Sequence, residues 1–344
     1  MTYRLLPLHE QVMVITGASS GIGLVTARQA AAAGSRVVLA ARNARDLERA
    51  VQDIRSAGGR AIAVAADVAD AKQVERIAAA AIGEFGRIDT WVNNAAVSIY
   101  GRAMQVSIED MRQQMDVNYW GQVYGSRVAV QHMRTRGGAL INVASAVADR
   151  AIPLQANYSA AKHAIKAFTD ALRMELEEEG VPISVTLVKP ASINTPFFEK
   201  AKTYFGVEPQ PIPPVYAPEV VSEVILHAAH HRVRELIAGG SGAKLSVARF
   251  APRITDLYME RWTFDSQRTD RPANGRPNNL YQAVDDDGGE RGRNWTGHTR
   301  GSSWYTKAFL YPRATALAVG TMMAAGLVVA RAGARSRSAI RSPQ

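Results

Sequence analysis

The sequence predicts an α/β fold in which a doubly wound parallel sheet of about seven strands lies between two layers of helices. Seven short apolar runs alternate with helical stretches between residues 12 and 238. Such alternation is typical of parallel sheets, because each helix returns the chain to the edge where the next strand begins. In addition, the glycine-rich and polar segments follow the ends of these strands, and ligands of such sheets bind at the strands' carboxyl ends.

The first strand, expected at residues 12–15, is joined to a helix at 24–33 by a glycine-rich turn at 16–23. Strand, glycine-rich turn and helix form the context in which backbone N–H groups and the helix dipole bind a phosphate. The glycines Gly17, Gly21 and Gly23 are spaced G-x-x-x-G-x-G, a variant of the usual dinucleotide pattern. A plain turn with helix-permissive glycines is the alternative.

The second and third strands, expected at residues 36–40 and 61–65, end near two charged side chains. A carboxylate after the second strand would hold the ribose 2′-OH of NAD. Arg42 stands there instead, and it could pair with the 2′-phosphate of NADP or be an ordinary loop arginine. Asp67, followed by Val68, is placed to meet an adenine amino group, or to cap the following helix.

The fourth strand, at residues 88–92, runs into two asparagines and two alanines, which suit close contact with a cofactor and bracing of neighbouring strands. Ser107 caps a long helix expected from residue 108 to about 133. Asn118 lies inside this helix, where asparagine is a poor helix former. It indicates either a local break that positions a water or a polar spot on the helix face.

The fifth strand, at residues 139–144, ends at Ser145, and the next helix carries Tyr158 and Lys162. In a helix these two residues project from one face, since they are i and i+4. A free phenol has a pKa near ~10, and a neighbouring ammonium favours the phenolate, which predicts a tuned general acid or base. Ser145 can hydrogen-bond the same substrate oxygen. Alone, Y-x-x-x-K is a weak motif and is common by chance.

The remaining strands are expected at residues 183–188 and 234–238, with a helix at 218–231 between them. Residues 191–217 should form a loop over the site. Its aromatic residues favour a bulky apolar alcohol or ketone, although they could equally pack the loop onto the domain: Phe197, Phe198, Tyr204, Phe205 and Tyr216.

Over roughly residues 8–240 the chain resembles the short-chain dehydrogenase/reductase family, because these motifs occur in the family's order. The resemblance implies a Rossmann-type fold, an NAD(P) cofactor, with NADP favoured by Arg42, and hydride transfer between an alcohol and a ketone or aldehyde. It implies a catalytic tetrad of Asn118, Ser145, Tyr158 and Lys162. The cofactor contacts that it implies are Thr16, Gly17, Ser19, Ser20, Gly21, Ile22, Gly23, Arg42, Asp67, Val68, Asn94, Ala95, Tyr158, Lys162, Pro190, Ala191, Ile193 and Thr195.

By this resemblance Tyr158 transfers a proton to or from the substrate oxygen, and Lys162 lowers the pKa of Tyr158 and binds the nicotinamide ribose. Ser145 orients the substrate oxygen, and Asn118 holds a water. Ala96 and Ala191 stand where the family usually has glycine. The family usually forms homodimers or homotetramers. The alternatives are a cofactor-binding scaffold or redox sensor with little turnover, and an epimerase or dehydratase on the same fold.

The composition narrows the classes of function. The chain has no cysteine, which excludes disulfides and thiolate metal sites, and no His, Asp and Glu cluster shows metal-ligand spacing. Residues 259–344 carry 13 Lys and Arg against 7 Asp and Glu, which is +6 of the net +10. Nucleic-acid binding is not expected, because the charge avoids the folded domain. Residues 1–11 lack a signal-peptide core, so we expect a cytoplasmic protein.

The composition changes near residue 258. We expect a catalytic domain at residues 1–257, an irregular or disordered linker at 258–312, an apolar helix that could anchor the chain to a membrane at 313–331 and a basic tail at 332–344. The uncharged run inside the apolar helix would span about 26 Å, the lower limit for a bilayer. Its weak hydrophobicity and the basic tail oppose spanning, so lying on the cytoplasmic membrane surface and docking on protein are alternatives.

Overall fold

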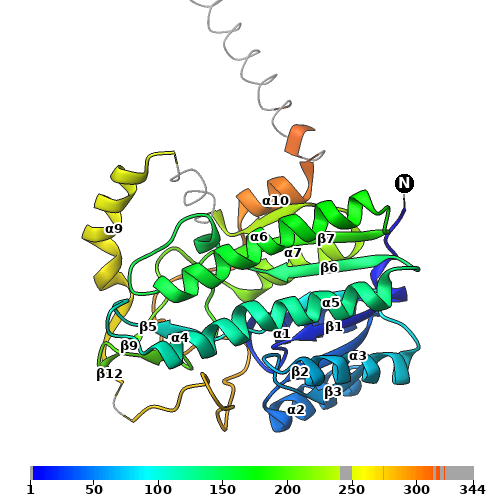
Figure 1. Cartoon of the computed structure of the whole chain (residues 1–344), viewed down its shortest axis with the longest axis horizontal. Helices are drawn as coiled ribbons and strands as arrows, with labels where there is room; N and C mark the ends of the chain where they lie inside the picture. Colours follow the sequence, from blue (N-terminus) through cyan, green and yellow to red (C-terminus); the bar gives the residue numbers. More distant parts are fainter. Residues whose placement is uncertain (1–2, 241–249, 274, 313–314, 318–320, 322–344) are drawn as a thin grey trace, which may run out of the picture.

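The computed structural model describes residues 3–240, 250–273, 275–312, 315–317 and 321. A seven-stranded parallel sheet forms its centre, in the order β11-β7-β6-β4-β1-β2-β3 (Figure 1). The strand order reverses between β1 and β4, which leaves a crevice at their carboxyl ends where such sheets bind ligands. The strands are β1 Val12–Thr16, β2 Arg36–Ala41, β3 Arg60–Ala65, β4 Thr90–Asn93, β6 Gly138–Val143, β7 Ile183–Pro190 and β11 Glu235–Ala238.

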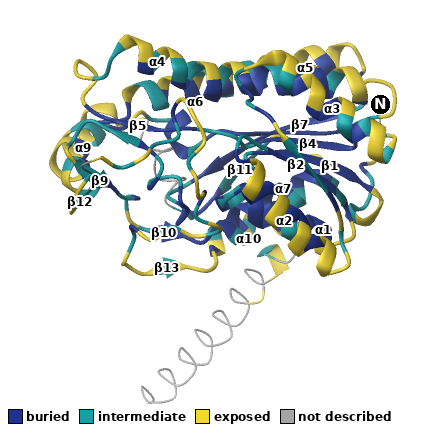
Figure 2. Cartoon of the chain, turned by 90° about the horizontal axis from the view of Figure 1, so that it is seen from below, coloured by how far each residue is buried: buried dark blue, intermediate teal, exposed yellow. Residues whose placement is uncertain are grey.

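Helices cover both faces of the sheet, which confirms the predicted three-layer arrangement (Figure 2). One layer consists of α1 Gly21–Ala32, α2 Ala44–Ser56 and α7 Pro218–His230. The other consists of α3 Ala71–Phe85, α4 Ile108–Met115, α5 Gly121–Met133 and α6 Ala156–Glu178. Because both faces are covered, the strands are apolar on both sides rather than alternating.

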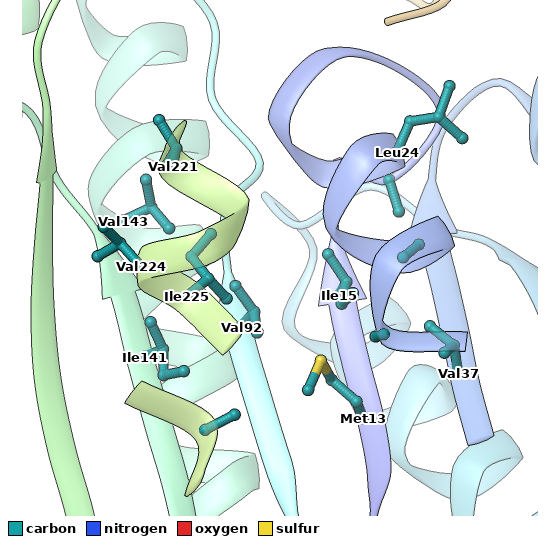
Figure 3. Packing of buried hydrophobic residues seen from close by; sticks show 14 of the residues in the cluster. Met13, Ile15, Leu24, Val37, Val92, Ile141, Val143, Val221, Val224 and Ile225 are labelled. Carbon is teal, nitrogen blue, oxygen red and sulfur yellow. The ribbon is translucent and has the colours of Figure 1, made fainter. Parts of the chain in front are cut away.

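The core on the α7 side is a continuous cluster of aliphatic side chains (Figure 3). Ile15, Val92 and Ile141 come from three adjacent strands and are fully buried. They belong to one buried cluster with Val224 and Ile225 of α7. Burying such side chains contributes about 1.5–3 kcal/mol each, so this cluster fixes the carboxyl ends of β1, β4 and β6 relative to one another.

The long helix expected from residue 108 to about 133 is interrupted. A π-helical turn at Asp116–Trp120 separates α4 from α5, and it contains Asn118. The Asn118 side chain accepts a hydrogen bond from Val97 N (2.8 Å) and donates one to Val97 O (2.9 Å). The structure therefore has the predicted break, and the buried amide uses it to hold the segment after β4.

Beyond β11 the chain continues across the carboxyl edge of the sheet. Helix α9, Pro252–Ser266, passes through the expected domain boundary at residues 257 and 258. Strand β12, Arg268–Pro272, pairs with β9, Val207–Pro209. Strand β13, Thr299–Arg300, pairs with β10, Val215–Tyr216, and α10, Trp304–Leu310, packs against α7 and β11.

The irregular linker expected at residues 258–312 is thus regular at its two ends, whereas the described residues between β12 and β13 form no helix or strand, as expected. The strands β12 and β13 form by pairing with strands of the loop between β7 and α7, and such distant pairing leaves no periodic pattern in the sequence. The apolar helix expected at 313–331 and the basic tail at 332–344 fall almost wholly outside the described residues. Within the part of the chain that the structure describes, no helix combines the length and the apolar character that crossing a bilayer requires.

Candidate active site

A cavity of about 620 Å³ lies at the carboxyl ends of the strands. Ser145, Tyr158 and Lys162 line it together, at one end, although they come from the end of β6 and from α6. Asn118 does not line the cavity. Its side chain is hydrogen-bonded to Val97, and Val97 lines the cavity. The structure therefore brings three of the four predicted catalytic side chains to one wall.

Most of the predicted cofactor contacts line the same cavity: Gly17, Ser19, Ser20, Gly21, Ile22, Arg42, Asp67, Val68, Asn94, Ala95, Pro190, Ala191, Ile193 and Thr195. Thr16 and Gly23 lie behind this lining. The Thr16 hydroxyl accepts hydrogen bonds from the backbone N–H groups of Asn94 (3.0 Å) and Ala95 (3.1 Å). Thr16 therefore holds the segment after β4 against the glycine-rich turn.

The glycine-rich turn is so tightly packed that two of its glycines have no room for a side chain. Gly17 has φ +65°, and a Cβ there would lie 2.8 Å from the Cα of Ala95. A Cβ at Gly23 would lie 2.2 Å from the carbonyl oxygen of Gly17. Neither position accepts a side chain. Ser20, the N-cap of α1, lines the cavity, so the positive end of the helix dipole faces it and favours an anion there.

Burial dominates the protonation of Tyr158 and Lys162. Desolvation raises the pKa of Tyr158 to about 12, although its hydrogen bond with Ser145 lowers it. Lys162 is 1% exposed, and burial lowers its pKa to about 7. The Lys162 Nζ donates to the Val143 carbonyl (2.9 Å) and lies 5.6 Å from the centroid of the Tyr158 ring.

The sequence predicts that Lys162 lowers the pKa of Tyr158. In this structure, without a cofactor, the pKa of Tyr158 is raised. Both groups are held away from bulk water, which disfavours the phenolate and the ammonium alike. Sequence spacing gives the direction of a charge effect but not the desolvation that opposes it. In this structure desolvation is the largest cause of both pKa shifts.

Arg42 and Asp67 lie together where the second and third strands end. Arg42 Nη1 is 3.7 Å from an oxygen of the Asp67 carboxylate, is buried, and has no hydrogen-bond partner among the described residues. Arg42 Nη2 donates to the carbonyl of Asn279. Asp67 is not the cap of α3, because Asp70 accepts the first backbone N–H groups of that helix. Arg42 therefore lines the cavity with its guanidinium held between the Asp67 carboxylate and the Asn279 carbonyl.

Some aromatic residues of the loop at residues 191–217 line the cavity, and others pack the loop onto the domain. Phe197 and Phe198 line the cavity, and the Phe197 ring lies 5.9 Å from that of Tyr158. Tyr204 instead donates to Asp110 (2.7 Å), and the Tyr216 hydroxyl accepts from Gly240 N (3.1 Å). The loop therefore both lines the catalytic end and packs itself onto the domain.

Among the cavity residues that the sequence patterns did not single out, two sets lie outside the motifs. Lys200 belongs to the loop after β7 and carries no motif. The others come from the C-terminal extension: Ile254, Thr255, Tyr258, Met259 and Thr263 of α9, and Asn279, Ala283 and Asp287 beyond β12. Their composition is typical of a linker, and only the contacts between distant parts of the chain reveal them.

The fold and the site define a nucleotide-binding α/β protein with a serine, tyrosine and lysine at the catalytic end of its cavity. Residues 11–204 match the short chain dehydrogenase family. The uncharacterized oxidoreductase YxnA of Bacillus subtilis (strain 168) is 45% identical over 338 residues, covering 97% of this chain and 93% of that protein. The chain therefore belongs to the short-chain dehydrogenase/reductase family and is an oxidoreductase of the NAD(P)-binding type.

Two further similarities concern characterised proteins. The 11-beta-hydroxysteroid dehydrogenase A of Sesamum indicum is 37% identical over 189 residues, 54% of this chain and 53% of that protein. The X-ray structure of an alcohol dehydrogenase from the archaeon Thermococcus sibiricus, complexed with 5-hydroxy-NADP, aligns with a TM-score of 0.58 and 25% identity. The alignment covers 66% of this chain and 95% of the alcohol dehydrogenase chain.

Proposed function

We propose that the protein is an NADP(H)-preferring alcohol dehydrogenase or carbonyl reductase that acts on an apolar substrate. The observation that carries this proposal is the single cavity that joins Ser145, Tyr158 and Lys162 at one end to the glycine-rich turn and Arg42 at the other. A dinucleotide is elongated in the same way, with a reactive ring at one end and an adenosine phosphate at the other.

When bound, the nicotinamide supplies or accepts the hydride. In the reductive direction Ser145 orients the carbonyl oxygen, and the Tyr158 hydroxyl donates its proton to that oxygen as negative charge develops there. Burial raises the pKa of Tyr158, so the phenol carries its proton before the reaction begins. Lys162, when protonated, stabilises the phenolate that remains. Because both side-chain groups of Asn118 bond to Val97, the expected water would bind the backbone of this π-helical turn.

The preference for NADP rests on Arg42. Its buried Nη1 has no hydrogen-bond partner among the described residues, and a planar guanidinium is well suited to a phosphate. The solved alcohol dehydrogenase that aligns with this chain was complexed with 5-hydroxy-NADP, which agrees with this choice.

The proposal of an apolar substrate is based on the side chains that line the cavity near Tyr158. Phe197, Ile152 and Met259 lie there, and Ile152 and Met259 are less than one tenth exposed. The 11-beta-hydroxysteroid dehydrogenase from Sesamum indicum carries a bulky apolar substrate in its name. We propose a lipid, steroid or terpenoid-like alcohol or ketone.

The experiment that tests this function is NADPH oxidation against a panel of apolar ketones and aldehydes, with Tyr158→Phe beside the unchanged protein. The variant should lose turnover by several orders of magnitude and bind NADPH with nearly the same affinity, because the ring still fills its place. Equal losses of turnover and binding would contradict the role of Tyr158. NADPH binding without turnover across the panel would favour a scaffold or redox sensor.

Three expectations remain part of the proposal: a cytoplasmic location, a homodimer or homotetramer, and membrane association through residues 313–331. A deletion of residues 313–344 tests the last of these. The cut follows α10 because Thr306 and Leu310 are buried against the domain. The deletion should release the protein from membranes and preserve activity in solution; unchanged sedimentation with membranes would refute an anchor in this segment.

A further inference from the structure

The segment at residues 279–293, here termed the clasp, crosses the cavity at the end away from Tyr158. Asn279, Ala283 and Asp287 line the cavity opposite the glycine-rich turn. Gly289 O accepts a hydrogen bond from Gly21 N (2.8 Å), at the start of α1. The clasp therefore contacts the turn that we assign to the cofactor phosphates.

The clasp is also fixed to the turn between β2 and α2, which we assign to the adenosine end. The Asn43 side chain donates to Val284 O (2.9 Å), and Asp287 N donates to the Asp46 carboxylate (2.7 Å). Asn43 and Asp46 both lie within five residues of Ala41, the last residue of β2. The clasp thus spans the nucleotide half of the cavity from one phosphate-binding element to the other.

Lys200 lies between the glycine-rich turn and the clasp. Its Nζ donates to the Ser20 hydroxyl (2.8 Å) and to the Asp287 carboxylate (2.9 Å). The Lys200 and Asp287 side chains are only 11% and 10% exposed, so this pair is sheltered from solvent. An ammonium beside Ser20 and the start of α1 is where a pyrophosphate would need a counter-charge, and a carboxylate of the clasp now neutralises it.

We propose that Lys200 is a ligand of the cofactor's pyrophosphate and that Asp287 of the clasp competes with the pyrophosphate for it. This proposal rests on the proposed function, because it requires a dinucleotide in the cavity. On binding, Lys200 exchanges the Asp287 carboxylate for a phosphate oxygen, and Gly21 N exchanges the Gly289 carbonyl. The clasp then roofs the bound nucleotide through its remaining contacts with Asn43 and Asp46.

The clasp is an addition to the common fold. The alcohol dehydrogenase from Thermococcus sibiricus is covered over 95% of its length by 66% of this chain, so its chain is too short to hold a counterpart of the whole extension. The Bacillus subtilis relative, in contrast, matches 97% of this chain. We therefore expect competition by the clasp only in relatives that match this chain through the C-terminal extension, and not throughout the family.

The proposal predicts that neutral variants of Lys200 and Asp287 change the affinity for NADPH in opposite directions. Lys200→Met should weaken NADPH binding about ten- to a hundredfold, the usual range for a hydrogen bond to a charged group. Asp287→Asn should instead tighten NADPH binding severalfold, because it removes a negative charge from beside the pyrophosphate. An ion pair with a merely structural role would weaken binding in both variants.

Titration calorimetry on the full chain would measure these affinities, with 2′-AMP as a probe that has the Arg42 contact but no pyrophosphate. Lys200→Met should leave 2′-AMP binding unchanged, and Lys200→Arg should restore NADPH binding. The matched control is the exposed pair Arg134 and Glu179, whose neutral variants should change neither ligand. Losses of the same sign in Lys200→Met and Asp287→Asn would overturn the clasp proposal, whereas an unchanged protein that fails to bind NADPH would overturn the proposed function.

Discussion

Lys162→Met should stabilise the cofactor-free protein while it abolishes turnover. The folded-state pKa of Lys162 is about 7 and its ordinary value is 10.5, because burial disfavours the charged amine. Between these values the unfolded chain binds more protons than the folded one, so the free energy of unfolding rises with pH across this window. The buried amine therefore destabilises the fold most at neutral and acidic pH.

The size of the effect follows from the shift. At pH 7, where the folded amine is half protonated, the cost of burying Lys162 is about 4 kcal/mol, and at pH 9 it is about 2 kcal/mol. Loss of the hydrogen bond to the Val143 carbonyl offsets about 1 kcal/mol of the gain. Lys162→Met should therefore be more stable by about 3 kcal/mol at pH 7 and about 1 kcal/mol at pH 9.

Urea unfolding at both pH values, without cofactor, measures this difference directly. Exposed Lys72, changed to Met, is the control, and its effect should be small and nearly independent of pH. A Lys162→Met protein that is less stable than the unchanged chain at pH 7 would refute the reasoning, as would a difference that does not shrink toward pH 9. A stabilised, inactive variant would show that Lys162 is retained for function at the expense of stability.

Two further predictions concern the cofactor. Arg42→Asp should shift the ratio of the NADP and NAD dissociation constants toward NAD by at least tenfold, since it replaces the proposed donor to the 2′-phosphate by a carboxylate; an unchanged ratio would contradict the proposal. Gly23→Ala should reduce binding of both cofactors about a hundredfold, because its Cβ would meet the Gly17 carbonyl at 2.2 Å. Calorimetry with both cofactors checks each variant, and Gly83→Ala, a helix position with open space around it, is the control for the second.

The parts of the fold that are local in sequence could be predicted from it. The apolar runs gave the strands, because a strand buried on both faces has no alternation to obscure it. The glycine-rich turn and the i and i+4 spacing of Tyr158 and Lys162 are likewise short-range patterns, and the structure places all of them at one cavity.

What the sequence could not show depends on long-range contacts and on burial. Arg42 meets Asn279 across 237 positions, and no local pattern signals that pairing. The strands β12 and β13 are short and polar, so they resemble a linker in the sequence, and they are strands because they pair with the distant loop between β7 and α7. The pKa values of Tyr158 and Lys162 follow from desolvation by the surrounding chain, which spacing alone does not reveal.

The position of the clasp in the chain has a consequence for how the enzyme is made. The last strand of the sheet, β11, ends at Ala238, and the clasp begins about 40 residues later. At ordinary rates of synthesis this interval lasts about 2 to 8 s. During that time a chain emerging from the ribosome has every strand of its cofactor cleft but not the segment that roofs it. By the clasp proposal, a nascent protein would take up its first nucleotide without competition from Asp287, and only later rounds of exchange would have to displace the clasp.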